Sequence, residues 1–342
     1  MAYTHLITQN VAPLGSRRIA IRDINGNRVG QIPLGSLTPP NPAKMLYRAG
    51  VGSDIHTNYS TGRSDCKNAF LFWNEEAKVN FICLSGDLDN VGTDDRLSIF
   101  ASIRDAYSPN TPVYVSGGNH DANGADEQFR PEEEVSASLL KWTGHPLYYS
   151  FEYGNDVYIF VGICKDTFSV AELQWLYETL EKYRNRRCFL FEHSFASESS
   201  GNAFGLYTYD LLNTARGRVF KSLLRHYHNI IWFHGHTHTE FLGQEFNSRA
   251  NIEKEAFGCW SVHVPSCAAP RTDADGDHQL QFEHEKSEAY VMDVYDDGIH
   301  LRGIDLVKRE FLPISSYWLD TTLQEIPAGT YTDSTGTIIT GG

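Results

Sequence analysis

Side chains that can bind metal ions occur in five short blocks, each directly after an apolar run. The blocks are Ser53-Asp54-Ile55-His56, Gly86-Asp87-Leu88-Asp89-Asn90, Gly117-Gly118-Asn119-His120-Asp121, Glu192-His193-Ser194 and His234-Gly235-His236-Thr237-His238. Asp, Asn and His supply oxygen and nitrogen ligands without thiolates, a set that suits Mn, Fe, Zn, Ni or Co. Two such ions about 3.5–4 Å apart can clamp a phosphoryl group and activate water. One carboxylate must then bridge the ions with both of its oxygens.

Each block requires a strand that ends where the block begins. The apolar runs predict these strands at residues 45–51, 79–84, 112–115, 188–191 and 230–233. In α/β sheets, ligands bind beyond the carboxyl ends of the strands. We therefore expect the blocks to meet at one edge, with glycines such as Gly86 and Gly118 allowing sharp turns.

The remaining pattern predicts a mixed α/β sandwich. Helical periodicity is expected at residues 67–77, 94–107, 132–142, 169–183 and 216–227. A hairpin is expected at residues 147–163, and further strands at 256–264, 289–294 and 299–304. Strands that alternate with helices early, followed by hairpins late, indicate this fold class.

Three regions are expected along the chain. Residues 1–44 form an N-terminal extension, in which residues 18–32 predict a β-hairpin around Asn25-Gly26-Asn27. Residues 45–312 form the catalytic domain. Residues 313–342 form a C-terminal tail, Thr- and Gly-rich from residue 330 on, that is mobile or depends on a partner.

The order of the five blocks carries a family resemblance. They follow the pattern D-x-H, GD-x-x-(D/N), GNH-(D/E), a lone His and GH-x-H, over about residues 48–265. This pattern resembles the calcineurin-like metallophosphoesterase superfamily. The resemblance implies a four-layer α/β/β/α sandwich of two mixed sheets. It also implies two metal ions (Mn, Fe, Zn or Ni) and hydrolysis of phosphate mono- or diesters by attack of a metal-bridging hydroxide.

The resemblance also implies a role for each ligand position. The implied metal ligands are Asp54, His56 and His238 for the first ion, Asn119, His193 and His236 for the second, and Asp87 as the bridge. His193 departs from the pattern of many members, which have His-His or His-x-Pro at this block.

The implied catalytic residues are His120 and Asp121. His120 is the general acid or transition-state contact near the leaving group, and Asp121 orients its ring. Asn90 stands where many members have Asp, a change that tolerates metal binding. Substrate-binding residues stay unassigned, although Arg271 and His263 are candidates for contacts with phosphate oxygens. The loop at residues 196–209 is a candidate for covering the site and contacting the substrate.

Two other features favour structural roles. Asp273, Asp275 and Asp277 resemble the start of a calcium loop, but His278 and His284 occupy positions that need Gly and Glu, which favours a solvated loop. The six cysteines form no C-x-x-C pair and sit mostly in apolar runs, which favours reduced core residues.

Composition restricts the partners. The 342-residue chain has 29 basic and 43 acidic residues and a net charge of -14. Such a surface repels polyanions, so a small phosphate ester or nucleotide is favoured over long nucleic acid. No secretory signal and no apolar run of about 18 residues is present, so a cytoplasmic location without membrane contact is expected.

A second class of function stays open. The segment from Asn25 to Gly35 resembles segments of phage tail or baseplate proteins. The alternative is therefore a virion-associated structural or assembly protein that carries a phosphoesterase domain. In either case, the extension and the tail are expected to support a homo-oligomer or a larger assembly. A nuclease is disfavoured because no basic stripe with interleaved aromatics is visible.

Overall fold

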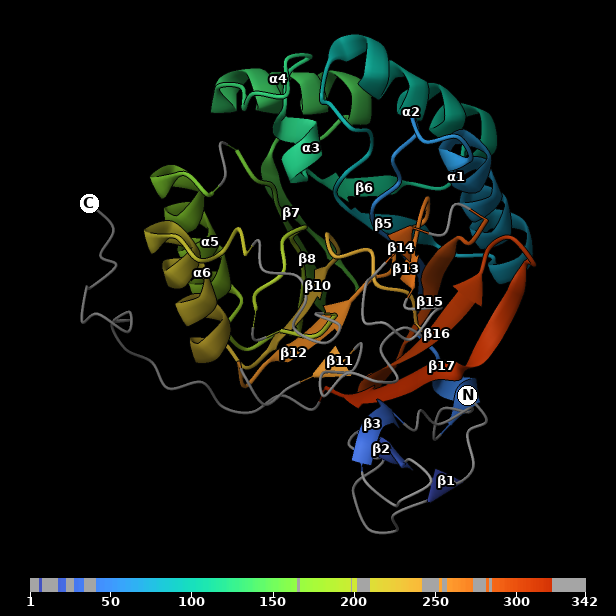
Figure 1. Cartoon of the computed structure of the whole chain (residues 1–342). Coiled ribbons are helices and arrows are strands. Elements are labelled where there is room, and N and C mark those ends of the chain that lie inside the picture. The colour runs from blue at the N-terminus through green and yellow to red at the C-terminus, as the bar shows by residue number, and fades with distance from the viewer. Residues whose placement is uncertain are drawn as a thin grey trace.

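Two six-stranded β-sheets lie face to face between two layers of helices (Figure 1). The structure is a computed structural model. It describes residues 6–7, 18–22, 28–33, 41–164, 167–197, 199–201, 210–241, 252–253, 257–272, 281–282 and 285–321. Within these ranges, the expected α/β/β/α arrangement of two mixed sheets is confirmed.

The first sheet has the strand order β17-β16-β15-β4-β5-β6. Its strands are β4 (Tyr47–Gly52), β5 (Phe81–Ser85), β6 (Val113–Ser116), β15 (Glu288–Val294), β16 (Gly298–Asp305) and β17 (Glu310–Asp320). The pairs among β4, β5 and β6 are parallel, whereas β15, β16 and β17 join in antiparallel pairs.

The second sheet has the order β11-β12-β10-β9-β8-β7. Its strands are β7 (Tyr148–Tyr153), β8 (Asp156–Val161), β9 (Cys188–Phe191), β10 (Ile230–His234), β11 (Ile252–Glu253) and β12 (Trp260–His263). The four inner strands run parallel, and β7 and β11 close the two edges in antiparallel pairs.

Helices cover the outer face of each sheet. They are α1 (Gly62–Leu71), α2 (Asp94–Tyr107) and α4 (Glu132–Thr143) on the first sheet, and α5 (Val170–Lys182) and α6 (Ala215–His226) on the second. Shorter elements are the 3₁₀ turn Pro42–Lys44 and α3 (Asn119–Ala122). The side chains of Ser169 and Thr214 accept hydrogen bonds from the first turns of α5 and α6, which fixes where these helices begin.

Aromatic side chains fill the space between the sheets. The ring of Phe191 lies between those of Phe160 and Phe233, at centroid distances of 4.9 and 4.8 Å and within 10° of parallel. All three are fully buried. Stacked neighbours on adjacent strands stabilise the sheet beyond their area burial, by about 0.5–1.5 kcal/mol per pair. The core thus holds the parallel strands whose carboxyl ends carry the blocks.

Most predicted elements are confirmed with small shifts, but two differ. The helix expected at residues 67–77 begins at Gly62 and ends in a π-helical turn, Phe72–Ala77. The boundary expected after residue 312 falls inside β17, which pairs with β16 as far as Asp320. The register of that pair shifts between Arg302 and Gly303, which leaves room for Pro313 in the edge strand.

The N-terminal extension contains the expected antiparallel hairpin, β2 (Arg18–Arg22) with β3 (Arg28–Pro33), and a short strand β1 (Leu6–Ile7). Its turn at residues 23–27 lies outside the described residues, as do residues 202–209, 273–280 and 322–342. Strands β13 (Arg271–Thr272) and β14 (Gln281–Phe282) form a separate pair. Among the helices described, none is long and apolar enough to cross a membrane.

Candidate metal centre

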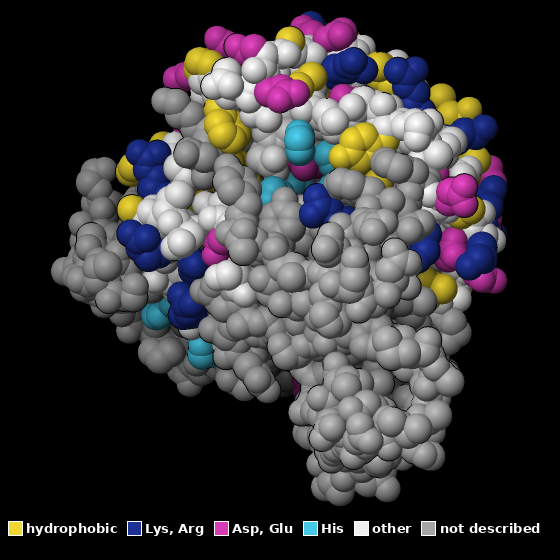
Figure 2. Space-filling model, in the orientation of Figure 1, with side chains coloured by type: hydrophobic (Ala, Val, Ile, Leu, Met, Phe, Trp, Pro, Cys, Tyr) yellow, Lys and Arg dark blue, Asp and Glu magenta, His cyan; other side chains and the backbone are white. Residues whose placement is uncertain are grey.

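The five blocks meet where β4, β5, β6, β9 and β10 end. Backbone hydrogen bonds join neighbouring loops, from Asp54 N to Gly86 O (3.1 Å) and from Gly235 N to His193 O (3.0 Å). Figure 2 shows histidine side chains gathered in a hollow of this face. The expectation that the strands bring the blocks to one edge is confirmed.

One candidate ligand group consists of Asp54, His56 and His238, whose ligand atoms all lie within 4.8 Å of one another. His238 Nε2 is 3.0 Å from Asp54 Oδ1 and 3.2 Å from His56 Nε2. All three residues are buried. Two imidazole nitrogens and a carboxylate that converge in this way form a set that a transition metal ion accepts.

A second group consists of Asp87, His193 and His236. His193 Nε2 lies 2.9 Å from Asp87 Oδ2. Asn119 begins α3 beside this group, and its buried Oδ1 has no hydrogen-bond partner within the described part of the chain. Because a buried amide oxygen without a donor is costly, a cation at this place would satisfy it. The residues present therefore fit a second metal ion.

Asp87 lies between the two groups. Its Oδ2 is 2.9 Å from His193 Nε2 and 3.7 Å from His56 Nε2, while its Oδ1 accepts a hydrogen bond from His120 N (3.0 Å). Asp54 Oδ1 is also only 3.7 Å from His193 Nε2. The two groups therefore adjoin, as a shared carboxylate requires.

The backbone at the candidate ligands is held in an unusual conformation. Positive φ angles occur at Asp54 (51°), His56 (38°), Asp87 (53°), His236 (71°) and His238 (58°). Non-glycine residues adopt this left-handed region only where surrounding contacts enforce it, and such residues cluster at functional sites. The loops are thus built to aim these side chains.

Three histidines donate a hydrogen bond from Nδ1 to a carbonyl oxygen. The pairs are His56 to Asn90 Oδ1 (2.6 Å), His193 to Ser85 O (2.7 Å) and His238 to Ala269 O (3.0 Å). Because the acceptors are carbonyl oxygens, the proton resides on Nδ1. Nε2 is then left to offer its lone pair to a metal ion.

Burial and neighbouring charges set the protonation states of the candidate metal ligands. Burial lowers the pKa of both His56 and His236 to about 3, so both are neutral ligands at pH 7. Burial also opposes a charge on His193, but Asp87 and Asp54 overcome this and raise its pKa to about 10. Burial disfavours the charged form of Asp87, yet His193 and His120 hold its pKa below the usual range. A proton on His193 thus balances the carboxylates, and a bound cation would displace it.

His120 lies at the edge of the centre. It is half-buried, its ring meets that of His56 edge-on (5.2 Å between centroids, 79°), and its Nδ1 donates to Asn90 O at 3.0 Å. Asp121 does not orient this ring as expected. Its carboxylate accepts from Leu88 N and Gly118 N, both at 2.9 Å. Adjacent residues of a helical turn do not face each other, so Asp121 shapes the loop instead.

Several further residues lie behind or beside the ligands. His263 is buried, and its Nε2 contacts Thr237 Oγ1 (2.9 Å), which makes it a support of the last block. Arg271 N donates to His238 O (2.7 Å), which places β13 beside the same block. Most of the loop expected to cover the site, residues 202–209, lies outside the described residues. Tyr59 also lies at the site, although no motif in the sequence predicted it. Its ring stacks on that of His56 with the ring centroids 4.6 Å apart.

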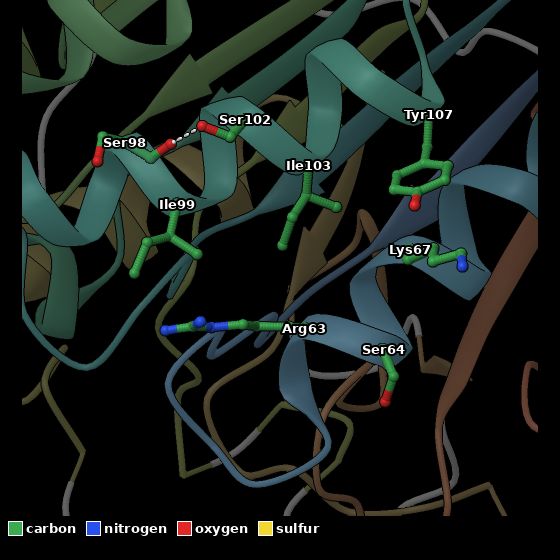
Figure 3. A pocket seen from close by; sticks show the side chains of 8 residues that line it. All are labelled: Arg63, Ser64, Lys67, Ser98, Ile99, Ser102, Ile103 and Tyr107. Carbon is green, nitrogen blue, oxygen red and sulfur yellow. Dashed lines mark hydrogen bonds between the residues drawn. The ribbon is translucent and has the colours of Figure 1, made fainter.

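A separate groove of about 460 Å³ lies between α1 and α2 (Figure 3). Its lining includes Arg63, Lys67, Ser98, Ile103 and Tyr107. None of the groove's lining residues belongs to the five blocks. The groove is therefore distinct from the candidate metal centre.

Comparison with known proteins places these features in a family. The family model described as calcineurin-like phosphoesterase matches residues 47–240. One similar solved structure is a conserved uncharacterised protein, a predicted phosphoesterase, from Streptococcus pneumoniae TIGR4 (12% identity, 80% of this chain and 97% of that chain covered, TM-score 0.38). Another is vacuolar protein sorting 29 from Cryptosporidium parvum (13% identity, 81% and 99% covered, TM-score 0.37). No curated protein matches. The family match spans more than half of the chain and all five strands that carry the blocks, so the chain belongs to the calcineurin-like phosphoesterase family.

Proposed function

We propose that the chain is a hydrolase that cleaves phosphate mono- or diesters of small molecules or nucleotides. The observation that carries this proposal is the meeting of two buried ligand groups on either side of Asp87. A pair of ions at this spacing of ligands is suited to in-line displacement at phosphorus.

The proposed cofactors are two divalent transition metal ions, from Mn, Fe, Zn or Ni. The residues that would hold them are Asp54, His56 and His238 for one ion, Asn119, His193 and His236 for the other, and Asp87 for both. When bound, such ions polarise phosphoryl oxygens and lower the pKa of water.

His120 is the proposed general acid. Its Nδ1 donates to Asn90 O, so the acid is the imidazolium form, whose second proton, on Nε2, passes to the oxygen that leaves phosphorus. Its ring is only half-buried, so a substrate can reach it, whereas the ligands beneath are shielded from water. Asp121 contributes indirectly, because its bonds to Leu88 N and Gly118 N hold two of the blocks together.

The net charge of -14 supports a small substrate rather than long nucleic acid. An assembly protein with a phosphoesterase domain is the second candidate. The N-terminal hairpin favours it, because β2 and β3 belong to neither sheet that carries the metal ligands. An extra module of this kind suits attachment to a partner or to another copy of the chain.

The test measures metal content and hydrolysis of bis-p-nitrophenyl phosphate and p-nitrophenyl phosphate, with and without Mn. We expect about two ions per chain and Mn-dependent turnover. Asp87→Asn should lose both metal and activity, whereas His120→Ala should keep the metal and lose about 10²–10⁴-fold in rate. If the ions bind but wild type cleaves neither ester, the hydrolase proposal fails and the assembly candidate is favoured.

A further inference from the structure

The groove between α1 and α2 contains two positively charged side chains. Arg63 and Lys67 lie one turn apart on α1, and both line the groove (Figure 3). Arg63 donates from Nε to Thr57 O at 3.4 Å, and Lys67 Nζ lies over the ring of Tyr107, 5.1 Å from its centroid. Within the part of the chain that the structure describes, neither cation forms an ion pair. Both charges are therefore available to a ligand.

The acidic side chains of α1 and α2 do not compensate these charges. Asp65, on α1, is buried. On α2, Asp105 pairs with Arg104 at 2.7 Å. The carboxylates of Asp94 and Asp95 accept hydrogen bonds from side chains outside the groove. A pair of positive charges that the protein leaves uncompensated attracts an acidic ligand.

Hydroxyl groups along the same groove are arranged as hydrogen-bond acceptors. Ser64, Ser98 and Ser102 each donate the hydroxyl proton to a backbone oxygen three or four residues earlier, at 2.6 or 2.7 Å. Because these protons are already used, the hydroxyl oxygens keep lone pairs for donors on a ligand. Ile99 and Ile103 add apolar surface to the α2 side of the groove. A ligand with N–H groups and an apolar side chain matches this lining.

The shape of the groove favours an extended chain over a compact molecule. Arg63, Ser64 and Ser102 are exposed, so the groove does not enclose a small molecule, whose binding sites cover most of its surface. Four residues of helix α1 separate the two cations by about 6 Å along the helix axis. Alternate residues of an extended peptide are about 6.6 Å apart and point to the same side. Acids at two alternate positions of a peptide therefore match the two cations.

We propose that the groove between α1 and α2 binds an extended acidic peptide segment of a partner protein, with Asp or Glu at two alternate positions. The two carboxylates contact Arg63 and Lys67 on the α1 side. The residue between them is apolar and points to Ile99 and Ile103 on the α2 side, while peptide N–H groups donate to the serine hydroxyl oxygens. The groove shares no residue with the metal centre, so this inference goes beyond hydrolysis and does not depend on it.

Fluorescence anisotropy with the full chain and the dye-labelled peptide Gly-Ser-Asp-Leu-Asp-Ser-Gly tests the proposal. Wild type should bind this peptide more tightly than the same peptide with Asn in place of both Asp, and the difference should shrink as salt is added. Arg63→Gln/Lys67→Gln should raise the Kd for the acidic peptide by about 3- to 20-fold, as the loss of two exposed ion pairs predicts. Lys44→Gln/Lys78→Gln is the matched control. It removes the same charge from exposed positions outside the groove and should keep the wild-type Kd.

Charge reversal tests the same contacts in a variant whose binding shows that it is folded. Arg63→Glu/Lys67→Glu should prefer the peptide with Lys in place of both Asp over the acidic one. Three results would overturn the proposal. Wild type could bind the acidic and the Asn peptides equally, or the control variant could lose as much affinity as the groove variant, so that only net charge matters. Alternatively, inorganic phosphate at the peptide's concentration could displace the peptide, which would make the groove a site for small anions.

Discussion

Asn90 links the two kinds of histidine at the centre through two different oxygen atoms. Its side-chain oxygen accepts from His56 Nδ1, and its backbone oxygen accepts from His120 Nδ1. A shift of this one residue would therefore turn both a candidate metal ligand and the proposed acid. Because the side-chain acceptor is a neutral amide rather than a carboxylate, it fixes the ring of His56 without adding charge beside Asp54 and Asp87.

Glu288 offers a test of pH dependence away from the ligands. Burial and the neighbouring Glu240 raise its pKa to about 8, against an ordinary value of 4.5. The folded state therefore binds more protons than the unfolded state between these values, so stability falls as pH rises from 4.5 through 8. Glu288→Gln stays neutral and can still accept the bond from Phe241 N (2.8 Å). Urea unfolding from pH 5 to 9 should show a flatter profile for this variant and higher stability than wild type at pH 9.

The control is Glu178→Gln, because Glu178 lies on the exposed face of α5. The pH profile of this variant should follow that of wild type. A Glu288→Gln profile with the same slope as wild type would show that Glu288 does not carry the dependence.

Single residues show why part of the site could be predicted from the sequence and part could not. His236 and His238 could be predicted as ligands because residue type and a place after an apolar run are both visible in the sequence. The hydrogen-bond partners of the Asp121 carboxylate could not be predicted. Left-handed turns at residues such as Asp87 decide which backbone amides face this carboxylate. The contact of Tyr59 with His56 likewise depends on the path of a turn that no periodicity encodes.

At the scale of elements, the loop after β10 is held by a buried network. Thr237 lies between His236 and His238, and its Oγ1 donates to Gly201 O (2.8 Å) and meets His263 Nε2 at 2.9 Å. Gly201 has φ 81°, and a Cβ there would lie 2.3 Å from the ring of His263, so only glycine fits. The network therefore fixes a loop in which both candidate ligands have positive φ.

Thr237→Val keeps the shape of the side chain and removes the hydroxyl, whereas Thr237→Ser keeps the hydroxyl. Loss of a support behind metal ligands typically lowers metal affinity about 10–100-fold, and we expect this for the valine variant in Mn calorimetry. The serine variant should stay close to wild type. Equal Mn affinity in both variants would mean that the hydroxyl does not position the loop.

Strand β17 marks the limit of prediction for elements. The boundary predicted after residue 312 falls inside this strand because Pro313 and the polar Ser315-Ser316 interrupt its apolar alternation. An edge strand tolerates this interruption where the register shifts, and its pairing depends on β16 rather than on its own sequence. Inner strands such as β9 are buried on both faces, so they appear in the sequence as apolar runs. These strands could therefore be predicted.

At the scale of the whole molecule, a buried ion pair ties the two sheets together at the end opposite the metal loops. Arg187 precedes β9, and both of its bonds to Asp156, at the start of β8, are 2.8 Å long. Arg187 also donates to Tyr295 O (2.7 Å) and Thr321 Oγ1 (2.8 Å), while Asp156 accepts from Tyr47 of the first sheet. These contacts cross from one sheet to the other.

Because the pair is buried, breaking one side of it leaves an uncompensated charge. Arg187→Met should cost about 3–5 kcal/mol of unfolding free energy, and the double variant Arg187→Met/Asp156→Leu should cost less than Arg187→Met alone. Urea unfolding measures both, with Arg186→Met as the neighbouring control, since its ion pair with Glu152 is exposed to solvent. The Mn content of the folded variants should match wild type, because Arg187 lies just before the start of β9, and the candidate ligand His193 follows the other end of this strand. If Arg187→Met lost Mn binding while still folded, the two ends of the sandwich would be coupled, and the packing between the sheets would have to set the geometry of the metal centre.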